Sequence, residues 1–319
     1  MLGRDRFRLI HGEILPQFFY SLYGLIIGCE RPLPFLPLSA ATRADVTIRF
    51  AALENRQETP VALAGKFSIF ADKEARFTSE LGFAAAISSG RLITVEASPH
   101  LSQAGLHAAL FGPAMGWLLF QRGLVPLHGC GVEVAGRLIA IVGHSGAGKS
   151  TLGRALVARG HRLVGDDQLL VDPVTTRVPP GMNVMRLWQD SAYRLGDGVS
   201  EEARIAAGYD KYYVDLGSPI PGDSLPLRLV LALGCDPSRD RPHYVPLNRQ
   251  QGAAMLCNHV YQRPVAYSAG YAPAVLEWST QVAVRVPVMA LDRPDNFEAL
   301  TDICEEIERL VAIEQGTPR

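Results

Sequence analysis

The chain has 319 residues, which corresponds to about two domains at roughly 150 residues each. Hydrophobic residues make up 48% and charged residues 20% of the sequence, an ordinary balance for a soluble globular protein with a buried core. The 31 basic and 32 acidic residues give a net charge of −1, so the composition carries no electrostatic signature of binding to nucleic acid or to an anionic membrane.

The cysteines and the apolar runs argue for a cytoplasmic protein. Five cysteines are scattered without a C-x-x-C pair, which predicts free thiols in a reducing compartment. The charged N-terminal sequence MLGRDRFRLIHGE lacks the apolar stretch of a signal peptide. The apolar runs 14–29 and 104–120 contain proline and polar residues and fall short of the roughly 20 apolar residues of a membrane span, so we expect both in the core.

Residues 1–103 are expected to be rich in β-strands. The segments with β-branched and aromatic residues between turn signals are DVTIRFAAL (45–53), KFSIFAD (66–72) and RLITVEA (91–97). The proline-rich segment RPLPFLPLS (31–39) must be extended or looped. Because this region carries no metal-binding cluster, nucleophile motif or glycine-rich loop, it is interpreted as a scaffold or recognition domain.

An apolar helix is predicted over residues 104–123, interrupted or kinked at Pro113 and ended by Gly123. Such a helix is expected to pack between two halves of the protein. The predicted boundary therefore gives a β-rich N-terminal domain with its connecting helix over residues 1–121, and a second domain over residues 122–319.

The second domain alternates strands and helices, which predicts an α/β fold with a mixed sheet. The expected strands and hairpins are 131–143, 161–167, 227–234 and 286–291. The expected helices are 149–160, closed by Gly160, together with 248–262 and the amphipathic segment 296–313.

The segment GHSGAGKST, residues 143–151, fits the phosphate-loop pattern G-x4-G-K-S with a strand before it and a helix after it. Lys149 should reach the β- and γ-phosphates, and the Ser150 hydroxyl should ligate Mg²⁺. The residues expected to bind the nucleotide are Gly143, Ser145, Gly146, Ala147, Gly148, Lys149, Ser150 and Thr151. This motif predicts a bound nucleotide, but it does not specify the reaction.

An acid pair, Asp166-Asp167, ends the strand that follows the phosphate-loop helix, which places two carboxylates close to the loop. One can hold Mg²⁺ and the other can accept the proton of an attacking hydroxyl. His128 precedes the hairpin that leads into the loop, and we expect the hairpin to bring it toward the same pocket. Without the phosphate loop nearby, the simpler interpretations would be that His128 is structural and that the acid pair is a surface Asp-Asp turn.

The segment Leu127–Val171 resembles the catalytic core of the bacterial HPr kinase/phosphorylase family, with its histidine, hairpin, phosphate loop and R-G-H-R-L-V-x-D-D sequence. The resemblance implies an HPr-kinase-like catalytic domain that uses ATP and Mg²⁺. It further implies that Asp167 is the base, that His128 assists, and that Asp166 joins Ser150 on the metal side. It is compatible with a homo-oligomer.

The chain departs from that family because it lacks the E-x-R-G-x-G motif, whose approximate place is taken by residues 179–196. Arg186 and Lys211 are candidates for further phosphate contacts, although surface roles are equally compatible with the sequence. This segment and YSLYGLIIGCERPLPFLP (20–37) are similar to the HPr-kinase-related kinases of lasso-peptide biosynthesis. That similarity implies a precursor peptide with an acceptor serine as the partner.

Two other functions stay open at this stage. A small-molecule kinase of the shikimate or gluconate type also combines such a loop with paired acids, but more than 120 residues precede the loop here and no arginine-bearing lid is recognisable. A nucleotide-binding regulatory module that transfers nothing would need no base beside the γ-phosphate.

Overall fold

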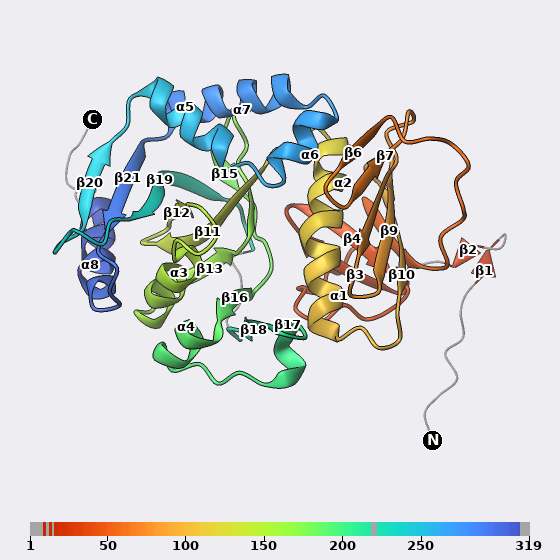
Figure 1. The fold of residues 1–319 in the computed structure, drawn as a ribbon, viewed down its shortest axis with the longest axis horizontal. Coiled ribbons are helices and arrows are strands. Elements are labelled where there is room, and N and C mark those ends of the chain that lie inside the picture. The colour runs from red at the N-terminus through yellow and green to blue at the C-terminus, as the bar shows by residue number, and fades with distance from the viewer. Residues whose placement is uncertain (1–8, 11–12, 15, 218–221, 313–319) are drawn as a thin grey trace.

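The computed structural model describes residues 9–10, 13–14, 16–217 and 222–312. Two halves lie side by side, with a long helix between them (Figure 1). The predicted fold class is confirmed, because the N-terminal half is built mainly of strands and the C-terminal half is a mixed sheet covered by helices. The division at residue 121 stays a prediction.

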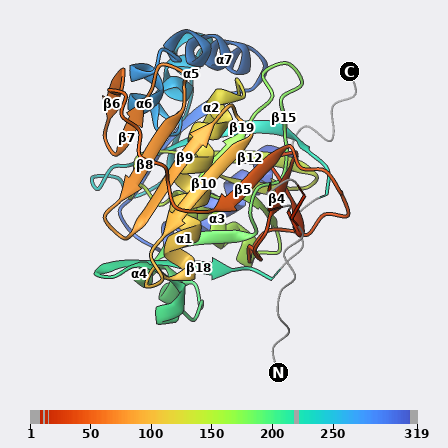
Figure 2. The same ribbon diagram turned by 90° about the vertical axis from the view of Figure 1, so that its right-hand side faces the viewer.

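The N-terminal sheet has the strand order β3-β4-β5-β10-β9-β8-β7-β6. Its strands are β3 (Phe18–Leu22), β4 (Leu25–Cys29), β5 (Val46–Phe50), β6 (Ala62–Ala64), β7 (Phe67–Ile69), β8 (Ala75–Ser79), β9 (Phe83–Ser88) and β10 (Leu92–Ala97). A short pair, β1 (Leu9–Ile10) and β2 (Glu13–Ile14), lies apart from it. The predicted strands at 45–53, 66–72 and 91–97 are confirmed, and Figure 2 shows the sheet facing the viewer.

The first apolar run is a β-hairpin rather than a membrane segment. Residues 18–29 form the antiparallel strands β3 and β4, and the β4 residues Ile27 and Cys29 are fully buried. Leu15, which belongs to the same run, lies outside the described residues. Among the helices that the structure describes, none is both long and apolar enough to cross a membrane.

The connecting helix consists of α1 (Gln103–Ala109), a π-helical turn η1 (Leu110–Ala114) and α2 (Met115–Gln121). The interruption expected at Pro113 therefore takes the form of a π-helical turn, which accommodates a residue without a backbone N–H. Gly123 follows with φ of +75°, as expected of a helix stop. The helix packs against the N-terminal sheet on one side and the second domain on the other, as predicted (Figure 1).

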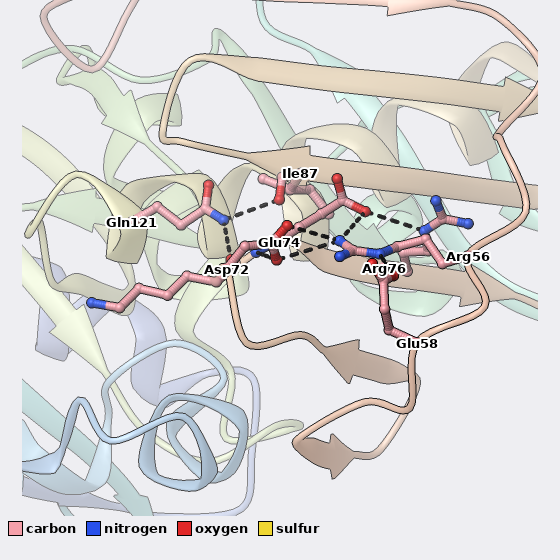
Figure 3. A network of polar contacts seen from close by, with 8 residues as sticks. Arg56, Glu58, Asp72, Glu74, Arg76, Ile87 and Gln121 are labelled. Atoms are coloured by element: carbon pink, nitrogen blue, oxygen red, sulfur yellow. Dashed lines mark hydrogen bonds and ion pairs between the residues drawn. The ribbon is translucent and has the colours of Figure 1, made fainter.

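Gln121 fastens the end of this helix to the N-terminal sheet. Its Nε2 donates to the backbone oxygens of Lys73 and Ile87 at 2.7 and 3.0 Å, and its Oε1 accepts from Gly90 N. Beside it, Arg56 pairs with Glu58, Asp72 and Glu74 (Figure 3). The helix and the β7–β8 turn are thus held together by a polar network at the edge of the sheet.

The second domain contains a mixed sheet of order β13-β11-β12-β19-β21-β20, with β14 paired to β11 and β15 paired to β19. Its strands are β11 (Pro126–Val134), β12 (Arg137–Val142), β13 (Arg162–Gly165), β14 (Gln168–Leu170), β15 (Arg177–Val178), β19 (Leu225–Cys235), β20 (His243–Pro246) and β21 (Val288–Arg293). The β12, β19 and β21 strands run parallel, whereas β11 pairs antiparallel with β12 through the Ala135-Gly136 turn. The predicted hairpin and strands are confirmed.

Helices cover both faces of this sheet. The α3 (Lys149–Ala158) and α8 (Ala299–Ala312) helices pack on one face, where Ile139 and Ile141 point. The α5 (Arg249–Asn258) and α7 (Ala272–Arg285) helices pack on the other, where Leu138 and Ala140 point. This alternation along β12 gives a strand that is apolar on both sides. Ile313 of the predicted last helix lies outside the described residues.

The remaining elements form a small sheet that the sequence did not predict. The strand order is β16-β18-β17, with β16 (Val184–Trp188), β17 (Arg204–Ala206) and β18 (Tyr209–Asp215). The short helices α4 (Gln189–Arg194), η2 (Glu201–Ala203) and α6 (Arg263–Ser268) complete the fold. All five cysteines are free thiols, as expected.

Candidate active site

The phosphate loop joins β12 to α3 and requires its glycines. A Cβ on Gly143 would lie 2.6 Å from the backbone oxygen of Leu233, which no side chain tolerates. Gly148 caps α3 with φ of +98°, in the left-handed region that favours glycine. The first backbone N–H groups of α3 therefore face the cavity beside the loop and suit an anion.

Lys149 is held within the loop. The residue is 8% exposed, and Nζ donates to the backbone oxygens of Gly143 and His144 at 2.9 and 3.1 Å. Burial lowers the pKa of Lys149, and the nearby Asp166 carboxylate acts in the opposite direction. The ammonium group is thus placed among carbonyl oxygens that an anionic phosphate can replace as partners.

Ser150 and Asp166 form a hydrogen-bonded pair at the start of α3. The Ser150 hydroxyl lies 2.9 and 3.1 Å from the two carboxylate oxygens of Asp166. Asp166 Oδ2 also accepts from the backbone N–H of Arg186 at 2.9 Å. The two metal-side residues predicted from the sequence are therefore in direct contact.

The acid pair interrupts a strand. Residues on either side of it, in β13 and β14, pair antiparallel with the same strand β11, and Asp167 has φ of +78°. A left-handed backbone at a residue other than glycine is uncommon and occurs often at functional sites. The irregular turn places the Asp166 carboxylate at the start of α3, next to the phosphate loop.

Asp167 lies between His128 and Arg186. One carboxylate oxygen forms an ion pair with Arg186, and both side chains are 15% exposed. The other oxygen, Oδ1, lies 3.4 Å from His128 Nδ1. The carboxylate is therefore fixed in position by a cation on one side and an imidazole on the other.

His128 reaches this site because β11 pairs with β14, which sets His128 opposite Gln168. Nδ1 lies 3.0 Å from the backbone oxygen of Asp167, and a carbonyl oxygen can only accept, so Nδ1 carries the proton. Desolvation, together with the smaller effects of the Lys149 and Arg186 charges, lowers the pKa of His128 to about 3. The imidazole is thus neutral at physiological pH.

Gln168 connects the acid pair to the connecting helix. Its side chain is fully buried, and Nε2 donates to the backbone oxygens of Phe111 and Gly112, both at 2.9 Å. These carbonyls belong to the π-helical turn, whose wider backbone leaves such groups available. The residue next to Asp167 is therefore anchored by a segment more than 50 positions earlier in the chain.

These residues line a cavity of about 550 Å³ between the phosphate loop, the small sheet and the start of α8. The predicted residues that line it are His128, Ser145, Gly146, Gly148, Lys149, Ser150, Thr151, Asp166, Asp167, Arg186 and Lys211. Gly143 and Ala147 lie in the loop but not on the cavity wall, and Ala147 O accepts from Arg293 Nε at 3.2 Å.

Other residues of the wall were not predicted, among them Trp188, Arg194, Tyr261, Arg293, Phe297 and Leu300. A signal for three of them was present. Arg293 ends β21, which runs parallel to β19, and ligands of open α/β sheets bind beyond the carboxyl ends of such strands. Phe297 and Leu300 follow this strand, so they could have been placed near the loop.

The residues present fit a Mg²⁺ ion. Mg²⁺ is usually held by one or two carboxylates together with water and substrate phosphates. Ser150 and Asp166 offer a hydroxyl and a carboxylate within 3.1 Å of each other, facing the cavity. Within the described part of the chain, no group of three or more His, Cys, Asp or Glu residues could hold a metal ion. A metal here would therefore depend on the nucleotide for its remaining ligands.

Residues 124–185 match the family model described as HPr Serine kinase C-terminal domain. An HPr kinase/phosphorylase from Azoarcus sp. strain BH72 is 30% identical over 180 residues, which is 56% of this chain and 52% of the relative. The enzyme of the same name from Burkholderia lata is 42% identical over 71 residues, covering 20% of this chain and 22% of the relative. The chain thus spans about half the length, or less, of the curated relatives it matches.

A solved structure of the Hpr(Ser) kinase/phosphatase from Coxiella burnetii aligns with 60% of this chain and 99% of its own, at 13% identity and a TM-score of 0.32. A score this low supports no argument about the fold. The family-model match, however, covers the segment on which the predicted resemblance rests. The HPr-kinase-like relationship is therefore confirmed for the region of the phosphate loop and the acid pair.

Proposed function

We propose that this chain is an ATP-dependent kinase that transfers the γ-phosphoryl group to a serine hydroxyl of a peptide. The observation that carries the proposal is the arrangement around one cavity: Lys149 in the phosphate loop on one side, and the Asp167 carboxylate on the other. A regulatory module needs only the first of these groups. The curated relatives carry the name HPr kinase/phosphorylase, which supports a kinase of this type.

In the proposed reaction, the serine oxygen forms a bond to the γ-phosphorus of ATP, the bond to the β–γ bridging oxygen breaks, and ADP leaves. Asp167 accepts the hydroxyl proton. Its ion pair with Arg186 orients the carboxylate, and His128 lies beside the other oxygen. A general base placed in this way typically contributes roughly 10²–10⁴-fold in rate.

Lys149 would bind the β- and γ-phosphates together with the N–H groups of the loop. Ser150 and Asp166 would hold Mg²⁺, which supplies positive charge against the phosphates when bound. Arg293 lies beside the loop and Phe297 lines the same cavity, so both are suited to contact the rest of the nucleotide.

The finer proposal is that the acceptor is a precursor peptide of the lasso type, with residues 1–121 as a recognition domain. It rests on the resemblance of segments 20–37 and 179–196 and on the absence of the E-x-R-G-x-G motif. A cytoplasmic location remains part of the same prediction.

The test is incubation of the protein with ATP and Mg²⁺ in the presence of one of several acceptors, followed by mass spectrometry. The acceptors are a serine-terminated precursor peptide, HPr, and a mixture of shikimate and gluconate. Phosphoserine on the peptide would support the proposal. Phosphorylation of the small molecules only, or ADP formation without a phosphorylated acceptor, would contradict it.

A further inference from the structure

The charged groups around the cavity are almost all paired. Arg186 pairs with Asp167, Arg194 with Asp190, and Arg293 with Asp295 at 3.7 Å. Lys149 is bound to the loop carbonyls that a phosphate would replace. The remaining cation on the wall is Lys211, which forms no ion pair with any residue that the structure describes.

The backbone fixes where Lys211 points. It lies on β18 directly opposite Trp188 of β16, and Arg186 lies two positions before Trp188 and therefore on the same face. This face of the small sheet forms the cavity wall across from the phosphate loop. The Lys211 charge also contributes to the lowered pKa values of His128 and Lys149, which line the same cavity.

Lys211 also sits against an exposed aromatic pair. Its Nζ lies 5.8 Å from the centre of the Trp188 ring, and Trp188 meets Tyr209 edge to face at 5.0 Å. Trp188 is 39% exposed and Tyr209 is 42% exposed, which is unusual for large aromatic side chains. An apolar surface beside a cation thus continues from the cavity to the outside of the protein.

An ammonium group that is partly removed from water and forms no ion pair is costly. Burial and the neighbouring Arg186 charge lower the pKa of Lys211, and the Asp166 carboxylate opposes this shift with a smaller effect. An anionic ligand would offset this cost, because a desolvated charge gains most from a partner of opposite sign. The donor phosphates already have the loop N–H groups, Lys149 and the metal-side residues, so the free cation suits the other substrate.

We propose that Lys211, with Trp188 and Tyr209, forms an acceptor subsite that binds a carboxylate next to the phosphorylated hydroxyl, with an apolar residue packed on the aromatic pair. This inference rests on the proposed kinase function, and it replaces the phosphate contact predicted for Lys211 from the sequence. The carboxylate can be the free C-terminus of a peptide or an acidic side chain that follows the serine.

Three synthetic probes separate these sources. They share the sequence acetyl-Leu-Ile-Gly-Ser and end as the free acid, as the amide, or as the amide with one aspartate after the serine. Phosphoryl transfer gives KM for each probe, and calorimetry gives its affinity for the MgADP-loaded protein. The variants are Lys211→Met, the conservative Lys211→Arg, and the matched control Lys73→Met, at an exposed lysine of the N-terminal half.

For the wild-type protein we expect one of the acidic probes to bind roughly tenfold more tightly than the amide, as for a hydrogen bond to a charged group. Lys211→Met should remove this preference while leaving the affinity for MgADP within about twofold, and Lys211→Arg should keep part of it. The free acid or the aspartate probe will identify the source of the carboxylate. Lys73→Met should behave as the wild type.

The outcomes distinguish this inference from the proposed function. Equal KM values and equal affinities for the acidic and amide probes would refute the Lys211 subsite. Phosphoryl transfer to these probes would still support the proposed kinase function. Carboxylate-dependent binding without any transfer would refute the kinase and support the subsite. If Lys211→Met lost MgADP binding but kept the preference for the acidic probes, Lys211 would contact the phosphates of the nucleotide and the acceptor subsite would be refuted. Absence of both binding and transfer with every probe would contradict both proposals.

Discussion

The two sides of the cavity are built in different ways. The side that faces the donor comes from one short segment, Ser145 to Thr151, in the phosphate loop and the first turn of α3. The opposite side brings together His128, Asp167, Arg186 and Lys211 from four different strands or turns. The first side can be read from a short motif, whereas the second exists only in the folded chain. Variants on the two sides should therefore have separable effects.

The largest effect is expected from Asp167→Asn on the acceptor side. The amide cannot accept the hydroxyl proton, so kcat should fall by roughly 10²–10⁴-fold. Nucleotide affinity should remain near that of the wild type, because Lys149 and Ser150 are unchanged. Single-turnover transfer and MgADP calorimetry measure the two quantities. Near-normal turnover would exclude Asp167 as the base.

Lys149→Ala should impair the part of the cavity that binds the nucleotide phosphates. Loss of a preorganised cation at the phosphates should lower kcat by roughly 10²–10³-fold and also weaken nucleotide binding. The joint loss distinguishes this variant from Asp167→Asn, which affects transfer alone. Unchanged kinetics would contradict the role assigned to the phosphate loop.

Much of the donor side could be predicted from the sequence because its geometry is local. The strand, glycine loop and helix of residues 137–158 follow from a pattern whose parts are neighbours in the chain. The hairpin at Ala135-Gly136 also follows from its turn residues, and it places β11, which carries His128, beside the strand that leads into the loop. In these cases the spacing along the chain determines the spacing in space.

The acceptor side could not be predicted in the same way. Residues 184–215 form a small sheet, and the pairing of Trp188 with Lys211 determines which side chains of this sheet line the cavity. No local sequence signal sets this register. The anchor of Gln168 in the π-helical turn is equally non-local, since it needs carbonyls of Phe111 and Gly112 that become available only when the helix widens. Burial and pairing decide these contacts, and neither is visible in a motif.

Two glutamines offer a matched test of this non-local support. Gln168 donates to the carbonyls of Phe111 and Gly112, and Gln121 donates to those of Lys73 and Ile87. Substitution of either by methionine leaves backbone oxygens unpaired and should lower the free energy of unfolding by about 1–3 kcal/mol.

Only Gln168→Met should also change catalysis, because Gln168 follows Asp167 directly. We expect roughly a tenfold lower kcat with unchanged nucleotide affinity, consistent with a small displacement of a catalytic group. Gln121→Met should keep the kcat of the wild type. An equal loss of kcat in both variants would mean that stability, rather than the position of Asp167, explains the effect.

The smallest effects are expected from pH, through one histidine in each region, the buried His107 and the partly exposed His128. Burial lowers the pKa of His107, between Phe35 and Phe111, to about 4, and that of His128 to about 3. Both pKa values lie below the usual value of about 6.5. Between the pKa in the folded protein and pH 6.5, the unfolded chain therefore binds a proton more readily than the folded protein does. The stability contributed by each neutral imidazole is thus complete above pH 6.5 and is lost as the pH falls toward 4 or 3.

Replacement of either histidine should therefore flatten the acid limb of the unfolding free energy, measured by urea denaturation from pH 4 to 8. His107→Leu should do so without changing transfer, because His107 lies in the core beside the N-terminal sheet. His128→Ala should do so and also slow transfer modestly, with nucleotide binding retained. A different result is possible for the pH dependence of the transfer rate. If the wild-type rate changed with a midpoint near pH 6.5 and His128→Ala removed this change, His128 would exchange a proton during the reaction. Its role would then extend beyond contact with Asp167.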